Sequence, residues 1–390
     1  MASQRIALNP GGPATIWADF CTPPAHSGPG LVLCLDARAD DVRVQHVLEF
    51  FAQEGYVVIA PRPAPGALLH AQDVAACVQA LATIDQCKGQ VGALTYGDGI
   101  DAALQCAAQG LLACLACYAP SGALLSAAYL ASMPHPLPLL LHLPQTTDAT
   151  ATGGLVVEPQ TLADAVLSTP KGQVYLYADG GAEGRLPHEH DAQPSAGIAH
   201  SRTLALLHDV IGPRYDLSAL WDEHRNCEFV TRDAEATMRT MVAQPYVNHV
   251  PTRTGGFGAT ELHRFYSQHF IPNNPLDMRS IPVSRTVGAD RVVNETILCF
   301  THDREIEWML PGIAPTGKYV EVALIGIITF RGGHLAHEHI YWDQASVLVQ
   351  IGLLDPTGLP VSGAKAAQKV LDPSLPANEM MPSWPASAPN

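Results

Sequence analysis

The residue types best suited to chemistry in this chain cluster on one short stretch. Residues 335–343 read LAHEHIYWD. Side chains alternate across a strand, so His337, His339, Tyr341 and Asp343 share one face and the residues between them share the other. On the concave wall of a curved sheet, the first face would project into a cavity, where pKa values shift towards the working pH. We expect this face to line a catalytic pocket.

A histidine and a carboxylate in one dry pocket perform proton transfer. The acid orients the imidazole tautomer or acts as the base itself, so a proton can pass in either direction. This chemistry needs no metal and no organic cofactor, and we expect neither.

Each of these residues also has a purely structural interpretation. Asp343 directly precedes a predicted helix that begins near Gln344, where an aspartate serves as a helix cap. His339 would then be an interior histidine without chemistry, and His337 would be solvated at the mouth of the pocket.

Two other histidine patterns raise the question of a metal. His334 and His337 have opposite parity on the strand, so His334, His337 and His339 cannot all converge, whereas open zinc sites need three converging ligands. His224 and Glu228 lie four residues apart on one face of a predicted helix, which is typical of a solvated helix contact. We therefore predict no metal site.

The elements that must position these residues fall into two halves. With 390 residues, two domains are the default count. In residues 1–185, short apolar runs such as 31–35, 56–60 and 91–95 alternate with helical stretches, which predicts an α/β domain with a parallel sheet. Residues 186–202 form the predicted linker. Residues 203–372 begin with helices and end in long strands, which predicts an α+β cone, and residues 373–390 form a flexible tail.

Composition excludes several classes of partner. Lys and Arg number 22 against 37 Asp and Glu, and the formal charge of -15 would repel nucleic acid. No apolar run reaches the ~20 residues of a membrane helix, and no basic-then-apolar signal opens the chain. The nine cysteines have scattered spacings, typical of buried thiols in a reducing compartment. We expect a cytoplasmic protein with no nucleic-acid or membrane partner.

One turn in the first half connects an apolar run to a helix through glycines. Residues 92–99 read GALTYGDG, and with the strand order they resemble the dienelactone hydrolase branch of the α/β-hydrolases. The resemblance implies a nucleophile at a sharp strand-to-helix turn. The family's catalytic triad consists of this nucleophile, an acid and a histidine. Aligning Gly97 with the final glycine of the motif puts Thr95 at the nucleophile position. Asp148 then lies one or two residues after the position of the acid, and Ala182 occupies the position of the histidine. We expect a hydrolase frame without activity.

The second half carries motifs that resemble the SnoaL-like polyketide cyclases of the nuclear-transport-factor-2-like superfamily. These are LPGIAPTG at 310–317, FRGG at 330–333 and YWDQ at 341–344 with the following LVQIGLL, and they cover about residues 203–355. The resemblance implies Asp343 as the general acid/base and His339 as a cavity residue. It also adds candidates from neighbouring strands, namely His249, Tyr246, Glu307 and Trp308.

Three functions follow from these observations. The first is an enzyme that uses the second-half pocket for cyclisation, isomerisation, dehydration or hydration of a small, largely apolar or aromatic carbonyl compound. The second is a lactone or ester hydrolase with a rearranged site around Thr95, Tyr96 and Asp148. The third is a non-catalytic binding or assembly protein. By fold analogy we expect a homodimer formed through the C-terminal domain.

Overall fold

The structure is a computed structural model of the whole chain. It describes residues 3–8, 17–24, 27–35, 40–64, 67–118, 136–145, 163–164, 166–167, 169–179 and 194–387. These residues form two compact units, Met1–Tyr215 and Asp216–Asn390.

The first unit is built on an eight-stranded sheet in the order β1-β2-β4-β3-β5-β6-β7-β8. The strands from β4 to β8 along this order pair in parallel, while β1 and β2 pair antiparallel at one edge, so the predicted parallel sheet is confirmed in its larger part. The strands are β1 (Gln4–Ala7), β2 (Trp17–Cys21), β3 (Gly28–Cys34), β4 (Val57–Arg62), β5 (Cys87–Tyr96), β6 (Leu115–Tyr118), β7 (Leu139–Pro144) and β8 (Gly172–Tyr177).

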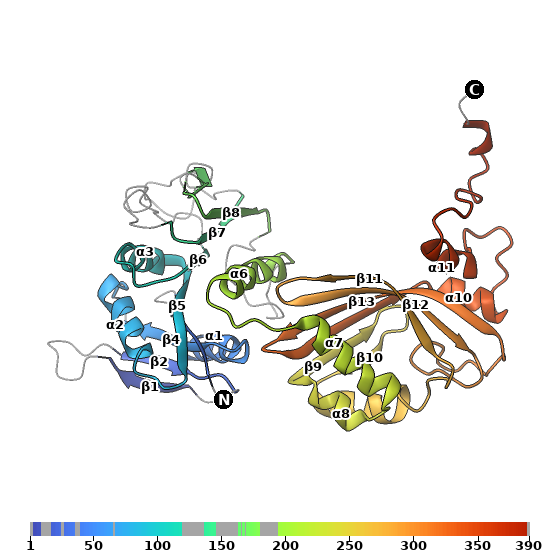
Figure 1. The fold of residues 1–390 in the computed structure, drawn as a ribbon, viewed down its shortest axis with the longest axis horizontal. Coiled ribbons are helices and arrows are strands. Elements are labelled where there is room, and N and C mark those ends of the chain that lie inside the picture. Colours follow the sequence, from blue (N-terminus) through green and yellow to red (C-terminus); the bar gives the residue numbers. More distant parts are fainter. Residues whose placement is uncertain are drawn as a thin grey trace. The chain divides into compact units, whose positions relative to one another are not determined.

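Helices cover both faces of this sheet, which is why its central strands are continuous apolar runs. Figure 1 shows α2 (Ala71–Leu81) and α3 (Ile100–Ala108) on one side, with α1 (Asp41–Gln53) and α6 (Ala196–Val210) on the other. Between the layers, β3 is buried along its whole length. This burial on both faces anchors the first unit.

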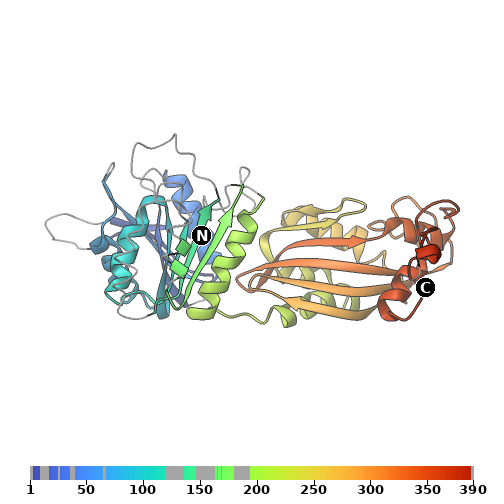
Figure 2. The ribbon, with the colours of Figure 1, turned by 90° about the horizontal axis from the view of Figure 1, so that it is seen from above.

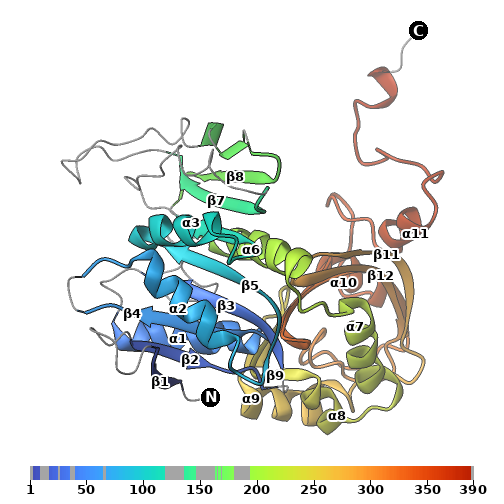
Figure 3. The same ribbon diagram turned by 60° about the vertical axis from the view of Figure 1, so that its left-hand side comes forward.

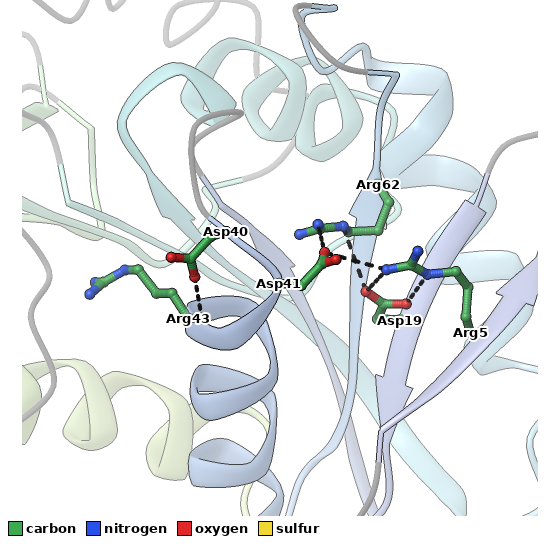
Figure 4. Close-up of polar contacts among 6 residues, drawn as sticks. All are labelled: Arg5, Asp19, Asp40, Asp41, Arg43 and Arg62. Carbon is green, nitrogen blue, oxygen red and sulfur yellow. Dashed lines mark hydrogen bonds and ion pairs between the residues drawn. The ribbon is translucent and has the colours of Figure 1, made fainter.

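The antiparallel edge is tied to α1 by a network of ion pairs (Figure 4). The Arg5 guanidinium donates two hydrogen bonds to the Asp19 carboxylate, at 2.6 and 2.9 Å. Arg62, at the end of β4, forms a close ion pair with Asp41, the first residue of α1. Asp40 caps this helix by accepting from the backbone N–H of Arg43 at 2.7 Å. The network therefore holds β1, β2, β4 and α1 together.

Helix α6 belongs to the first unit, although the predicted linker covered its first half. His200 lies against Glu54 of the first unit at 3.6 Å, and Thr203 hydrogen-bonds to Tyr118 and His142 at 2.9 and 3.0 Å. These buried polar contacts place residues 196–210 in the first unit. The boundary between units accordingly falls at residue 215, after the predicted linker at 186–202.

The second unit has a six-stranded sheet in the order β10-β9-β14-β13-β12-β11. All neighbours pair antiparallel except β14 and β9, which pair in parallel. Strands β11 to β14, orange to red, run side by side in Figure 2. The strands are β9 (Met241–His249), β10 (Thr254–Phe257), β11 (Arg279–Val287), β12 (Arg291–Thr301), β13 (Tyr319–Arg331) and β14 (His334–Trp342).

Helices contact the two faces of this second sheet differently. Helix α7 (Leu217–Arg225) packs on β12 and β14, and α9 (Ala259–Arg264) packs on β9. Figure 3 shows α8 (Ala234–Arg239) following α7. Helices α10 (Gln344–Ile351) and α11 (Ala364–Leu371) pack on β13. Ala367 of α11 packs with Ile297 and Cys299 of β12. These two residues lie on one face of β12, and Thr296 and Leu298, which line a cavity, lie on the other.

No helix among the described residues combines the length and the apolar character that crossing a bilayer requires.

Candidate functional site

The second unit contains a small apolar cavity with a polar end. Its free volume is about 60 Å³. Aromatic and aliphatic side chains together form most of its wall, and the polar groups come from the helices and from the sheet. The lining residues are Trp221, Arg225, Glu228, Phe229, Val247, His249, Tyr266, Phe270, Ser280, Asn294, Thr296, Leu298, Trp308, Leu324, Gly326, Glu338 and Ile340.

The face of β14 that lines this cavity is the opposite of the predicted one. Glu338 and Ile340 face the cavity, whereas Tyr341 is 40% exposed and Asp343 is exposed. His337 and His339 pack edge-on against Tyr246, with ring centroids 5.8 and 5.6 Å apart. The predicted polar stripe therefore lies on the outer face of the sheet. Strand parity separated the two faces correctly, but parity alone does not say which face is concave.

Asp343 has the structural role that was the alternative interpretation. It is the N-cap of α10, and its Oδ1 accepts from the backbone N–H of Ala345 at 3.0 Å. The Ser346 hydroxyl donates to its other oxygen at 2.6 Å. Asp343 and His339 do not line the cavity, so the geometry does not bring together the pair on which the predicted proton transfer depended.

Glu307 also lies away from the cavity, while its neighbour Trp308 lines it. Residues 307–309 form a turn where a strand was predicted. Glu307 pairs with His269, and both side chains are more than a third exposed. The Trp308 indole N–H donates to Asn274 at 2.8 Å, which fixes the ring against the cavity.

His249 is the predicted catalytic residue that the structure does place in the cavity wall. It is 4% exposed, and its ring lies 4.7 Å from Trp308 and 5.6 Å from Phe270 between centroids. Its Nδ1 is 3.2 Å from the carbonyl oxygen of Thr254. Because a carbonyl can only accept, Nδ1 carries the hydrogen and Nε2 has the free lone pair. Burial lowers the pKa of His249 to about 4, so the ring is neutral at pH 7.

A second histidine lies between two buried carboxylates at the polar end. His224 Nε2 is 3.3 Å from Glu228 and 3.1 Å from Glu338, and all three side chains are at most 4% exposed. Burial lowers the pKa of His224, but the two carboxylates outweigh it and raise the pKa to about 10. Burial also raises the pKa of Glu228. The Tyr266 hydroxyl donates to Glu338 at 3.3 Å.

This cluster is the group of described residues whose donor atoms approach closely enough to hold a metal ion, all within 4.8 Å of one another. The His224 and Glu228 spacing was visible in the sequence, but it was interpreted as a solvated helix contact. A single-turn π-helix at Asn226–Val230 continues α7 and carries Glu228 inwards. Glu338 was assigned to the outer face, so nothing in the sequence linked it to the other two.

The cavity wall also carries an oriented amide. Asn294, on β12, is 6% exposed. Its Oδ1 accepts from Arg285 Nε at 3.0 Å, and Arg285 is itself held by Ser218 and Asp222 at 2.7 and 2.8 Å. Since the guanidinium can only donate, the amide oxygen is turned to Arg285 and the amide N–H groups remain as donors.

The turn at which the resemblance implies a nucleophile is built around two glycines, Gly97 and Gly99. Gly97 is at its apex, with a left-handed φ of +60°, and a Cβ on Gly99 would lie 2.7 Å from the Cβ of Cys34. Thr95 is fully buried inside β5, opposite Cys34 and Cys117, and not at the turn. Tyr96 is buried, with its ring stacked 5.2 Å from that of Tyr118. Asp148 and Ala182 lie outside the described residues.

Comparisons with known proteins found likenesses of structure and none of sequence. No protein-family profile and no curated protein matches the chain. A Klebsiella pneumoniae protein assigned as a dienelactone hydrolase is 14% identical, covers 52% of this chain and 97% of its own, and has a TM-score of 0.41. An esterase of Pyrococcus furiosus is 14% identical over 54% of this chain and 91% of its own, with a TM-score of 0.41.

A protein of Jannaschia sp. CCS1 assigned as a SnoaL-like polyketide cyclase is 16% identical. It covers 37% of this chain and 99% of its own, with a TM-score of 0.29. Solved structures similar to this chain thus include both kinds of protein that the motifs resemble, and the predicted resemblances are confirmed as structural likenesses. At these identities and TM-scores they assign no activity to this chain.

Proposed function

We propose that the second unit is an enzyme that moves a proton on a small, largely apolar carbonyl compound, as in isomerisation, dehydration or aldol-type cyclisation. His249, and not His339 or Asp343, takes the proton in this proposal. The observation that carries it is a neutral imidazole of fixed tautomer in the wall of an aromatic cavity.

Proton abstraction next to a carbonyl needs a base and a donor to the oxygen. His249 Nε2 has a free lone pair, because Nδ1–H is engaged with Thr254. A base with a pKa of about 4 removes a carbon-bound proton only if the developing oxyanion is stabilised. The Asn294 amide supplies that donor, since Arg285 holds its oxygen away from the substrate. Because Arg285 already orients the Asn294 amide, no free-energy cost of turning the amide arises when negative charge develops on the substrate oxygen.

The size of the cavity limits the substrate. About 60 Å³ holds roughly four water molecules, well below the ~300 Å³ of a site for drug-sized ligands. The aromatic or polyketide-like guest implied by the resemblance would need the cavity to widen. We therefore propose a compact ketone or aldehyde as substrate.

The experiment is proton exchange on ketones of increasing size. The full chain is incubated in D2O with acetone, butanone, cyclopentanone or 2-indanone, and the loss of the α-proton signal is followed by 1H NMR. We expect exchange above the buffer rate for the smaller ketones and a decline with size. Asn294→Ala should slow it ~100-fold, whereas Asn248→Ala, on the outer face of β9, should leave it unchanged. No exchange above buffer for any ketone would contradict the proposal and favour a binding module.

A further inference from the structure

The buried cluster of His224, Glu228 and Glu338 contains an unexplained nitrogen. His224 is fully buried, and two carboxylate oxygens lie 3.1 and 3.3 Å from its Nε2. Nevertheless, Nε2 has no hydrogen-bond partner. Both carboxylates are near enough to bond but lie off the direction in which an N–H would point.

The other ring nitrogen fixes which way the imidazole presents its lone pair. His224 Nδ1 is 2.6 Å from the Thr240 hydroxyl, which donates to the Thr237 carbonyl at 2.7 Å. That hydroxyl has no second hydrogen, so it accepts and Nδ1 carries the hydrogen. Histidines that bind metals through Nε2 are oriented in this way by a partner on the opposite nitrogen.

A lone pair facing two buried carboxylates is repulsive unless a cation lies between them. The cation is either a proton on Nε2 or a metal ion. Without a metal, a proton on Nε2 is that cation, which is why the two carboxylates raise the pKa of His224. No hydrogen bond from Nε2 aligns with either carboxylate in the structure, and a metal ion bound to all three groups would replace the proton. Ligands bound at about 2.0 Å in a tetrahedron lie about 3.3 Å apart, close to the observed separations from Nε2.

We propose that His224, Glu228 and Glu338 bind one divalent transition-metal ion of the zinc type, with its fourth position open to the cavity. Two carboxylates balance the charge of the ion, and an imidazole with carboxylates is a ligand set that zinc accepts. Tyr266 donates to Glu338 at 3.3 Å and Thr240 orients His224, so two of the three ligands have supporting partners. Glu228 and Glu338 line the cavity, so the bound ion would face its contents.

The test measures metal binding directly and does not depend on the proposed reaction. The full chain is stripped with a chelator and titrated with Zn²⁺ by calorimetry and with Co²⁺ by visible absorption. We expect one ion per chain, a rise in Tm with Zn²⁺, and the intense visible bands of four-coordinate Co²⁺. His224→Gln and Glu338→Gln should each weaken binding at least 100-fold.

The matched control is His263→Gln, which removes the histidine of an exposed histidine–glutamate pair with Glu235. It should bind the metal like the unchanged chain. Thr240→Val keeps the site testable if a cluster variant unfolds, and it should weaken binding 10- to 100-fold through the orientation of His224. Equal affinity in the unchanged chain, Thr240→Val and the cluster variants would overturn the site, as would the absence of both a Tm shift and Co²⁺ bands. Metal binding without ketone exchange would support the site and count against the proposed reaction alone.

Discussion

At the scale of single residues, the two histidines His249 and His339 are a matched pair on opposite faces of one sheet. His249 lines the cavity, and His339 packs against Tyr246 on the outer face. His249→Gln should lower ketone exchange at least 100-fold, because the amide cannot accept a proton from carbon. His339→Gln should keep the full rate. If His339→Gln is the variant that loses exchange, the catalytic face is the one predicted from the sequence.

A third histidine, His142, is expected to make the stability of the first unit depend on pH. His142 is fully buried in β7, bonded to Tyr177 and Thr203 at 2.9 and 3.0 Å, and burial lowers its pKa to about 3. Between pH 6.5 and this value the unfolded chain binds a proton that the folded chain does not, so stability falls as the pH falls. From pH 6.5 to 4.5 the loss due to His142 is about 2 kcal/mol.

The measurement is hydrogen exchange of the β6 and β7 amides across this pH range, corrected for intrinsic rates, in the unchanged chain and in His142→Gln. The variant is expected to be less stable at pH 7 because it loses a hydrogen bond. However, it should lose less stability on acidification. Parallel stability curves for the two proteins would show that His142 does not contribute to the pH dependence.

At the scale of elements, the assignment of Asp343 to helix α10 has a measurable consequence. Asp343→Ala should destabilise the second unit by about 1 kcal/mol, because the backbone N–H of Ala345 and the hydroxyl of Ser346 both lose their acceptor. Asp343→Ser keeps a capping oxygen and should recover most of that free energy. Urea unfolding gives both values. Ketone exchange should be unchanged in both variants, since Asp343 is outside the cavity, and its loss would instead indicate a catalytic role.

The elements themselves were largely predictable, and the site was only partly so. Period-two alternation in residues 335–343 located β14 closely, because this strand is long and one of its faces is more buried than the other. Which face of β14 is concave depends on the packing of α7 and α11 on opposite sides, and this is tertiary information. Similarly, Gly97 was aligned with the final glycine of the nucleophile motif, although its backbone conformation shows that it occupies the apex of the turn.

At the scale of the whole molecule, the two units each have a core of their own, so they should unfold separately. Four of the five tryptophans, at 221, 308, 342 and 384, belong to the second unit, so tryptophan fluorescence reports mainly on it. Hydrogen exchange in β3 and β5 reports on the first unit. We expect the two probes to give different urea midpoints.

One substitution tests this independence. Gly99→Ala places a Cβ about 2.7 Å from that of Cys34, so it should destabilise the first unit by about 1–3 kcal/mol. Gly197→Ala is the control, because a Cβ there meets nothing within 4 Å and the residue is in helix α6. Gly99→Ala should lower the exchange midpoint of β3 and β5 and leave the fluorescence midpoint in place. A fall of both midpoints together would mean that the chain unfolds as a single cooperative body.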